Sequence, residues 1–220
     1  MRRVYTAEWL DTDWGTADEI SASLADLRRV NRWFGGVSTT EWMLRQVARD
    51  LGKASLSVLE VASGSGDVPQ ICNRRLERGG VRLEITLLDR APSHLRNGDR
   101  AVAGDALALP FRDDSFDVVS CGLFAHHLEP GDLVRFVNEA LRVCRSAVLI
   151  NDLVRSWMHL AFVYTGMPLY RSRLTRHDAP ASVRQAYTVE EMRALLRQTR
   201  ASRVEIRRLY FFRMGVIVWK

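Results

Sequence analysis

The feature that most constrains the fold is an alternation of short apolar runs with helical patterns from residue 56 onward. The runs at residues 56–62, 81–89 and 146–152 have the length of buried strands, whereas residues 67–80 and 130–144 carry apolar side chains at helical spacing. Strands that are separated by helices require right-handed crossovers, which make the sheet largely parallel and cover both of its faces. We therefore predict an α/β fold with a doubly wound sheet.

Weaker signals complete this sheet. Apolar runs at residues 100–106 and 115–124 predict two further strands, and residues 91–97 form at most a short helix. A last helix is expected at residues 188–199, where a threonine precedes two glutamates. Two β-rich runs joined by a tight connection end the chain and predict an antiparallel pair at the sheet edge, so seven strands are expected.

Two segments lie outside the alternation. Residues 1–52 hold two probable helices, which we assign to an N-terminal helical cap. Residues 153–187 are rich in Trp, Met, Phe and Tyr and are too long for a simple crossover, so we assign them to a helical cap insertion. A chain of 220 residues suits one domain, and we predict a single domain over residues 1–220 with its core in residues 53–220.

The charge pattern bears on possible nucleic-acid partners, and the cysteines bear on the cellular compartment of the protein. The net charge is +6, but arginines are scattered singly or in pairs among acidic residues, so a solvated surface is favoured over a nucleic-acid partner, with an anionic substrate or RNA as the alternative. No apolar run is long enough for a membrane span, and no signal-peptide pattern is found. The three cysteines lack CxxC spacing, which favours reduced core thiols in a cytoplasmic protein.

The glycine-rich stretch "LEVASGSGD" lies where the first strand passes into the first helix. Gly64 and Gly66 allow a sharp backbone turn and the close approach of a ligand. In a doubly wound sheet, ligands bind beyond the carboxyl ends of the strands, next to such helix N-termini. We therefore interpret this stretch as a ligand-binding loop.

Three ligands compete for this loop. A nucleoside triphosphate loop requires a lysine that is absent here. A dinucleotide fingerprint requires a third glycine, but Pro69 occupies that position, which disfavours a nicotinamide-dependent oxidoreductase. Glu60, four residues before Gly64, suits the ammonium group of an amino acid and so favours S-adenosylmethionine.

The segment "EVASGSG", residues 60–66, resembles the [ED]-x-[GA]-x-G-x-G pattern of the class I S-adenosylmethionine-dependent methyltransferases, with Ala62 in place of the commoner glycine. The resemblance covers nearly all of residues 40–220 and implies a Rossmann-like fold, S-adenosylmethionine as cofactor and S-adenosylhomocysteine as product. It implies that the carboxylate of Asp89 accepts hydrogen bonds from the ribose hydroxyls. The cofactor-binding residues that it implies are Glu60, Ala62, Gly64, Gly66, Asp89, Arg90, Asp105, Ala106, Cys121 and Leu123.

Two histidines follow the fourth predicted strand, near the expected position of the transferred methyl group. Family members that resemble the ubiquinone- and menaquinone-biosynthetic enzymes often carry a histidine there. His126 or His127 is therefore a candidate general base or acceptor-positioning residue, with His126 preferred, and a purely structural role is the alternative. Because clustered carboxylate ligands from several strand ends are missing, we expect no metal.

The acceptor pocket is expected to come from the cap segments. An aromatic-rich cap suits a flat apolar acceptor such as a phenol or a quinone, and we favour methylation of oxygen over carbon. An RNA or protein methyltransferase and a non-catalytic cofactor-binding protein are the alternatives, and both a monomer and a homodimer stay open. The predicted walls are Trp33, Phe34, Trp157, Phe162, Tyr164 and Tyr170.

Overall fold

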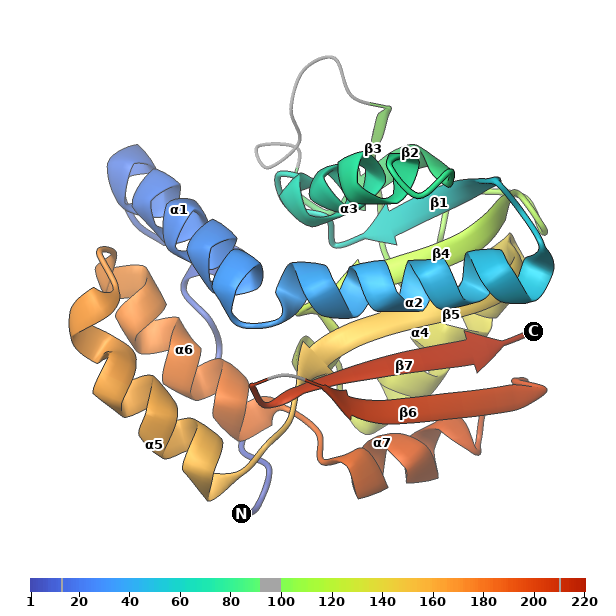
Figure 1. Cartoon of the computed structure of the whole chain (residues 1–220). Helices are drawn as coiled ribbons and strands as arrows, with labels where there is room; N and C mark the ends of the chain where they lie inside the picture. The colour runs from blue at the N-terminus through green and yellow to red at the C-terminus, as the bar shows by residue number, and fades with distance from the viewer. Residues whose placement is uncertain (13, 92–99, 210) are drawn as a thin grey trace.

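The computed structural model describes residues 1–12, 14–91, 100–209 and 211–220. Its central feature is a seven-stranded sheet with the order β3-β2-β1-β4-β5-β7-β6 (Figure 1). The first five strands pair in parallel, and β7 pairs antiparallel with both β5 and β6. The strands are β1 (Ser55–Val61), β2 (Arg82–Asp89), β3 (Ala101–Ala103), β4 (Phe116–Gly122), β5 (Cys144–Leu153), β6 (Arg203–Leu209) and β7 (Arg213–Trp219).

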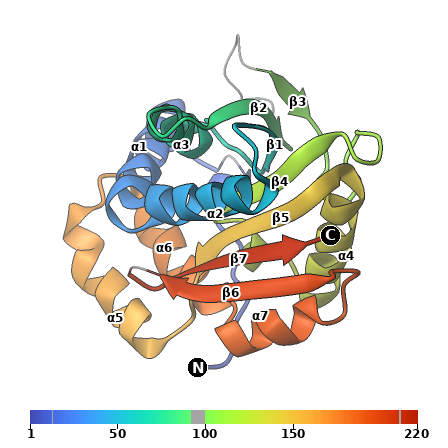
Figure 2. The same ribbon diagram turned by 45° about the vertical axis from the view of Figure 1, so that its right-hand side comes forward.

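This sheet confirms the predicted doubly wound, mostly parallel fold with antiparallel strands at its C-terminal edge. β7 lies between β5 and β6, so the chain passes to the outer edge strand first and then turns back (Figure 2). Buried aliphatic side chains of β4, β5 and β7 point to both faces, as a sheet covered on two sides requires. The stretch at 91–97, predicted as at most a short helix, falls largely outside the described residues.

Helices cover both faces of the sheet. α2 and α3 contribute Met43, Leu44 and Leu76 to the core on one face, and α4 and α7 contribute Phe136 and Met192 to the core on the other. None of the described helices is long and apolar enough to span a membrane. The helices are α1 (Ala17–Trp33), α2 (Gly36–Leu51), α3 (Asp67–Glu77), α4 (Pro130–Val143), α5 (Trp157–Gly166), α6 (Arg173–Gln185) and α7 (Val189–Leu196).

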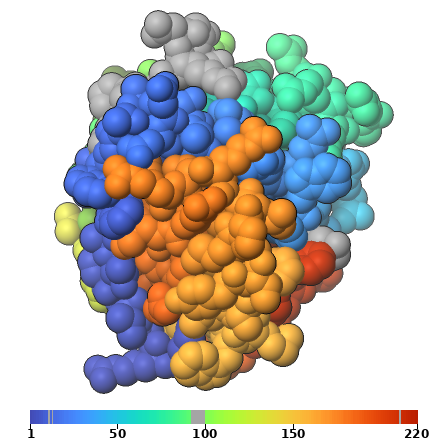
Figure 3. Space-filling view, turned by 90° about the vertical axis from the view of Figure 1, so that its left-hand side faces the viewer, coloured from blue at the N-terminus to red at the C-terminus, as the bar shows by residue number. Residues whose placement is uncertain are grey.

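A helical layer of α1, α5 and α6 lies beyond the carboxyl ends of the parallel strands (Figures 1 and 3). The two N-terminal helices, both assigned to the cap from the sequence, have different positions. α1 packs on α6, whereas α2 lies across the sheet because Val37, Met43, Leu44 and Val47 form a buried apolar stripe on it. The cap thus consists of α1 together with the inserted helices α5 and α6.

The first nine residues, which we call the N-terminal strap, run along α6 (Figure 3). The backbone N–H of Val4 donates to the carbonyl of Arg184 at 3.1 Å, and that of Trp9 donates to Asp178 Oδ1 at 2.9 Å. The guanidinium of Arg3 donates to the carbonyls of Gln185 at 2.7 Å and Leu128 at 2.9 Å. These bonds tie the start of the chain to the cap and to the segment between β4 and α4.

Candidate active site

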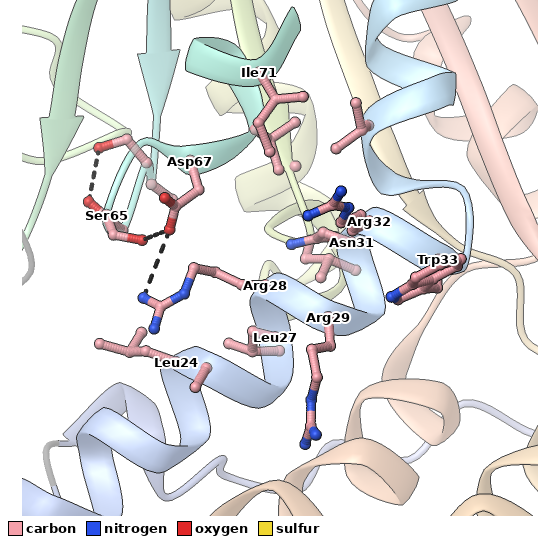
Figure 4. A pocket seen from close by; sticks show the side chains of 18 residues that line it. Leu24, Leu27, Arg28, Arg29, Asn31, Arg32, Trp33, Ser65, Asp67 and Ile71 are labelled. Atoms are coloured by element: carbon pink, nitrogen blue, oxygen red, sulfur yellow. Dashed lines mark hydrogen bonds and ion pairs between the residues drawn. The ribbon is translucent and has the colours of Figure 1, made fainter. Parts of the chain in front are cut away.

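A cavity of about 450 Å³ lies between α1 and the loop that joins β1 to α3 (Figure 4). Its floor is the glycine-rich stretch predicted to bind the ligand, and its roof is α1. Gly122 and Leu123, at the end of β4, close one end. The cavity therefore occupies the carboxyl edge of the sheet, where doubly wound folds bind their ligands.

The backbone of the glycine loop is shaped for close approach. Gly64 and Gly66 have φ of +50° and +67°, in the left-handed region that favours glycine. A Cβ at Gly66 would lie 2.6 Å from a methyl carbon of Leu87, so a side chain there would collide with β2. A Cβ at Gly64 would meet no atom within 4 Å, which leaves open space above the loop for a ligand.

Asp89, at the end of β2, is joined to this loop. The backbone N–H of Gly64 donates to Asp89 Oδ2 at 2.8 Å, and that of Ala91 donates to Oδ1 at 3.0 Å. These bonds fix the orientation of the carboxylate, and a carboxylate oxygen that accepts one hydrogen bond can also accept a ligand hydroxyl through its second lone pair. The arrangement suits a ribose whose two hydroxyls meet one carboxylate.

Glu60 lies behind Gly122, with Oε1 3.9 Å from the position that a Cβ at Gly122 would take. The side chain is buried, and within the described part of the chain its Oε2 has no hydrogen-bond partner. Burial raises the pKa of Glu60 to about 7, although a hydrogen bond with Ser120 opposes the shift. A buried carboxylate oxygen without a partner is a position that an ammonium group would satisfy.

The other predicted cofactor residues occupy three positions. Ala62, Gly64 and Leu123 line the cavity, and Gly66 caps α3 next to it. Cys121 is a buried core residue beneath the site. Beyond the cavity lining, near the ends of β2 and β3, lie Arg90, Asp105 and Ala106.

Sequence reasoning missed the contribution of α1. This helix places Arg28, Arg29 and Arg32 along the cavity wall (Figure 4). Arg28 Nη1 lies 3.7 Å from Asp67 Oδ2, and the Ser65 hydroxyl donates to the same oxygen at 2.5 Å. α1 thus brings the guanidinium of Arg28 to the loop, whereas Arg29 points away from it and pairs with Asp26 (Figure 4). The sequence predicted a helix in this region without indicating that it would cover the loop.

A second cavity, of about 840 Å³, adjoins the first and lies between the cap and the ends of the strands, where Leu123, Leu153 and Arg213 line it. Four of the residues predicted from the sequence as pocket walls, Trp33, Phe34, Phe162 and Tyr170, line it. The two cavities share their boundary residues, which are Leu27, Arg29, Trp33 and Leu123. We call these the cofactor cavity and the acceptor cavity.

Two predicted walls lie elsewhere. Trp157 is 69% exposed at the start of α5, and Tyr164 is 47% exposed and accepts a hydrogen bond from Arg184 at 2.6 Å. Neither lines the acceptor cavity, because α5 turns Phe162 and Val163 inward instead. The aromatic content of residues 153–187 did not indicate which face of α5 would be buried.

His126 lies in the short helix Ala125–His127 and lines the acceptor cavity. We call the part of the cavity that Glu8, His126 and His127 line its polar end. Its ring Nδ1 lies 2.6 Å from Asp152 Oδ1, and its backbone N–H donates to Asp152 Oδ2 at 3.0 Å. Its Nε2 lies 3.5 Å from Glu8 Oε1. Burial lowers the pKa of His126, but the charge and hydrogen bonds of Asp152 and Glu8 outweigh it and raise the pKa to about 10.

Glu8 is a functional candidate that the sequence did not reveal. The N-terminal strap carries it to the cavity, where its Oε1 accepts hydrogen bonds from Ser182 Oγ at 2.6 Å and Gln185 Nε2 at 2.7 Å. Its Oε2 lies 4.0 Å from His127 Nε2. Because Glu8 is more than a hundred residues from His126 in the sequence, no local spacing could have linked them.

Arg213, the first residue of β7, is a buried cation on the same cavity. Its guanidinium donates to the Phe34 carbonyl at 3.2 Å, to Asn151 Oδ1 at 3.5 Å and to Asn31 Oδ1 at 3.0 Å. Within the described residues no ion pair joins Arg213 to a carboxylate, and burial lowers its pKa to about 10. The cavity therefore contains a positive charge whose hydrogen-bond partners are all neutral.

Comparisons with known proteins agree with this geometry. Residues 59–150 match the family model described as a methyltransferase domain. A demethylmenaquinone methyltransferase of Thermotoga maritima is 31% identical over 119 residues, which are 53% of this chain and 51% of the relative. A ubiquinone/menaquinone biosynthesis C-methyltransferase of Roseobacter denitrificans is 35% identical over 106 residues, which are 42% of this chain and 40% of the relative. The chain thus spans about half the length, or less, of these curated relatives.

Among solved structures, the plantazolicin methyltransferase BpumL, in complex with a pentazolic desmethylPZN analog and SAH, has a TM-score of 0.69. The alignment covers 96% of this chain and 94% of that one at 12% identity, so the likeness concerns the fold alone. A SAM-dependent methyltransferase from Aquifex aeolicus has a TM-score of 0.53 at 15% identity over 74% of this chain and 81% of that one.

The sheet order and the glycine loop tied to Asp89 define a Rossmann-like cofactor-binding protein. The family match over β1 to β5 makes this more specific. Residues 59–150 match a methyltransferase domain, and the chain resembles the class I S-adenosylmethionine-dependent methyltransferases in sequence and in fold. Glu60 and Asp89 do not line the cofactor cavity but lie directly behind it, against Gly122 and Gly64. Their chemistry fits S-adenosylmethionine, because the unpartnered Glu60 oxygen suits an ammonium group and the Asp89 carboxylate suits a ribose.

Proposed function

We propose that this protein is a cytoplasmic enzyme that transfers a methyl group to the oxygen of a small, largely apolar aromatic acceptor such as a phenol or a quinol. The observation that carries the proposal is that the cofactor and acceptor cavities adjoin and share Leu27, Arg29, Trp33 and Leu123. Bound S-adenosylmethionine would supply an electrophilic methyl group. The protein's task is to hold the acceptor in line with that group, where proximity and orientation lower the barrier most.

The acceptor cavity supports a flat apolar ligand. Phe34, Phe162 and Phe211 pack edge to face or stacked, with ring centroids 5.6 to 5.7 Å apart, at the wall beneath α5. Arg213 beside them offers a cation to an acidic ring substituent. A cavity of about 840 Å³ is larger than one ring needs, so it also suits a substituted acceptor.

We propose that the reacting oxygen binds at the polar end, beside His126 and His127. Asp152 and Glu8 flank the two ring nitrogens of His126, so positioning is favoured over simple proton abstraction as its role. Methylation of carbon is the second candidate, because one curated relative is named a demethylmenaquinone methyltransferase and the other a ubiquinone/menaquinone biosynthesis C-methyltransferase.

The test combines binding with turnover. Calorimetry of the full chain should detect binding of S-adenosylhomocysteine and no binding of NAD. Radiolabelled S-adenosylmethionine should then transfer its methyl group to members of a panel of phenols and hydroquinones, and not to RNA or protein. Binding of NAD alone would refute S-adenosylmethionine as the cofactor. Labelling of RNA or protein alone would refute a small aromatic molecule as the methyl acceptor.

A matched pair of variants tests the cavity assignment. Ala179 lies on α6 in the wall of the acceptor cavity, and Ala161 is exposed on α5. Ala179→Phe should reduce methyl transfer to bulky phenols while the affinity for S-adenosylhomocysteine is unchanged, whereas Ala161→Phe should alter neither.

A further inference from the structure

We propose that Glu8, His126 and His127 form a binding site for one divalent transition-metal ion at the polar end of the acceptor cavity. One ligand atom from each residue lies within 4.8 Å of the others. His126 Nε2 is 3.5 Å from Glu8 Oε1, and His127 Nε2 is 4.0 Å from Glu8 Oε2. Two ligands bound to one tetrahedral zinc ion stand roughly 3.4 Å apart, so small side-chain rotations would close this set around an ion.

The ligand types suit zinc or a similar ion. Two imidazoles with one carboxylate form a donor set found at catalytic zinc sites, which keep a position open for water or substrate. Calcium and magnesium prefer oxygen ligands and would gain little from two imidazoles. The site would be open on the side of the acceptor cavity, which all three residues line.

The surroundings hold the ligands in place. Asp152 lies against His126 Nδ1 at 2.6 Å, the arrangement in which a carboxylate orients a metal-binding imidazole. Ser182 and Gln185 both donate to Glu8 and fix its carboxylate. His126 Nε2 is buried and faces Glu8 Oε1 at 3.5 Å, a distance longer than a normal hydrogen bond, so these two ligand atoms already point toward one another at the site.

A metal here would serve the proposed function, and this consequence rests on that proposal. A phenol that enters the cavity would lose its O–H proton to water, and its oxygen would bind the cation at the open position. The oxygen would then attack the methyl carbon as the carbon–sulfur bond breaks, so the sulfonium becomes a neutral thioether. Metal binding itself requires neither cofactor nor acceptor, and it can be tested alone.

The experiment uses the full chain after treatment with a chelator. Zn²⁺ is titrated by calorimetry, and Co²⁺ is titrated by absorption, which reports the coordination geometry. We expect one site per chain and a low-coordinate Co²⁺ spectrum. Glu8→Gln and His127→Gln each remove a direct ligand and should weaken binding by at least about tenfold, the smallest effect typical of residues that only support such ligands. His126 is buried, so the test relies on the two more accessible ligands.

Glu190→Gln is the control, because Glu190 is an exposed glutamate on α7 that pairs with Arg208 and belongs to no cluster of this kind among the described residues. It should bind both ions as the unmodified protein does. The proposed site would be overturned if the Glu8→Gln variant bound the metal as tightly as the unmodified chain. It would also be overturned if the unmodified chain showed no saturable metal binding. If S-adenosylhomocysteine still binds and methyl transfer survives chelation, only this inference fails and the proposed function stands.

Discussion

The carboxylate of Asp89 accepts a hydrogen bond from the backbone N–H of Gly64 at 2.8 Å, so the end of β2 and the glycine loop form one unit. In the proposed complex Asp89 would bind the cofactor ribose, and it also holds the glycine loop in place. A single side chain therefore links two parts of the cofactor site, and its loss should affect both.

Asp89→Ala should weaken the binding of S-adenosylhomocysteine by about 1–3 kcal/mol, because charge-assisted hydrogen bonds to the ribose are lost and the Gly64 N–H loses its acceptor. Calorimetry measures this change directly. Glu84→Ala, an exposed change on the same strand, is the control and should leave the affinity intact. An unchanged Kd for the Asp89 variant would remove Asp89 from the site.

Cofactor affinity should depend on pH through Glu60. Burial raises the pKa of Glu60 to about 7, so below that pH the folded protein without ligand holds a neutral carboxyl group. An ammonium partner requires the carboxylate, and binding must then release a proton. The affinity for S-adenosylhomocysteine should therefore rise by up to about tenfold per pH unit from about pH 5.5 to about 7 and level off above it.

Glu60→Gln tests the origin of this pH dependence. The amide stays neutral at every pH, so the affinity of the variant for S-adenosylhomocysteine should be weaker above about pH 7 and should not depend on pH below it.

The folding stability of the ligand-free protein should depend on pH in the opposite direction. The folded state holds more protons than the unfolded chain between 4.5, the ordinary pKa of a glutamate side chain, and the raised pKa of about 7. The free energy of unfolding of the ligand-free protein should therefore fall as pH rises through that range, and less so in the variant.

The hydrophobic core offers a prediction independent of function. Phe136 on α4 is fully buried and packs edge to face against Phe124 with ring centroids 5.3 Å apart. Phe136→Ala should lower the free energy of unfolding by about 3–5 kcal/mol, because it removes buried apolar area and leaves a cavity. Urea denaturation followed by circular dichroism measures this change. A loss below about 1 kcal/mol would mean that α4 does not pack on the sheet as described.

The parts of the fold that local pattern controls were predictable. Gly64, Gly66 and Asp89 lie at the ends of strands whose apolar runs are continuous, and a parallel sheet brings all such ends to one edge. α2 was assigned to the wrong layer because an amphipathic stripe shows that a face is buried and does not show which partner covers it.

The acceptor side was less predictable for a physical reason. Glu8 and Arg213 reach the cavity from opposite ends of the chain, and their role depends on long-range packing of the strap and β7. Neither residue belongs to a motif, and a single glutamate or arginine is most often a solvated surface group. His126 was found because it follows a strand end, whereas its two carboxylate neighbours were not linked to it.

The N-terminal strap should be required for the acceptor site and not for the cofactor site. Arg3 donates hydrogen bonds to three carbonyls, those of His126, Leu128 and Gln185, and forms an ion pair with Glu129. Arg3→Ala removes these bonds and should release the strap that carries Glu8. We expect a loss of about 1–3 kcal/mol in the free energy of unfolding and a lower rate of methyl transfer.

The affinity for S-adenosylhomocysteine distinguishes this local effect from general damage, because no strap residue is among the described residues that line the cofactor cavity. The affinity for S-adenosylhomocysteine should stay the same in Arg3→Ala, while limited proteolysis should cut the strap faster than it does in the unmodified protein. Arg2→Ala, a change at the exposed neighbouring position, should alter neither. If Arg3→Ala weakened cofactor binding as much as methyl transfer, the strap would act through the whole fold and Glu8 would lose its assignment to the acceptor side.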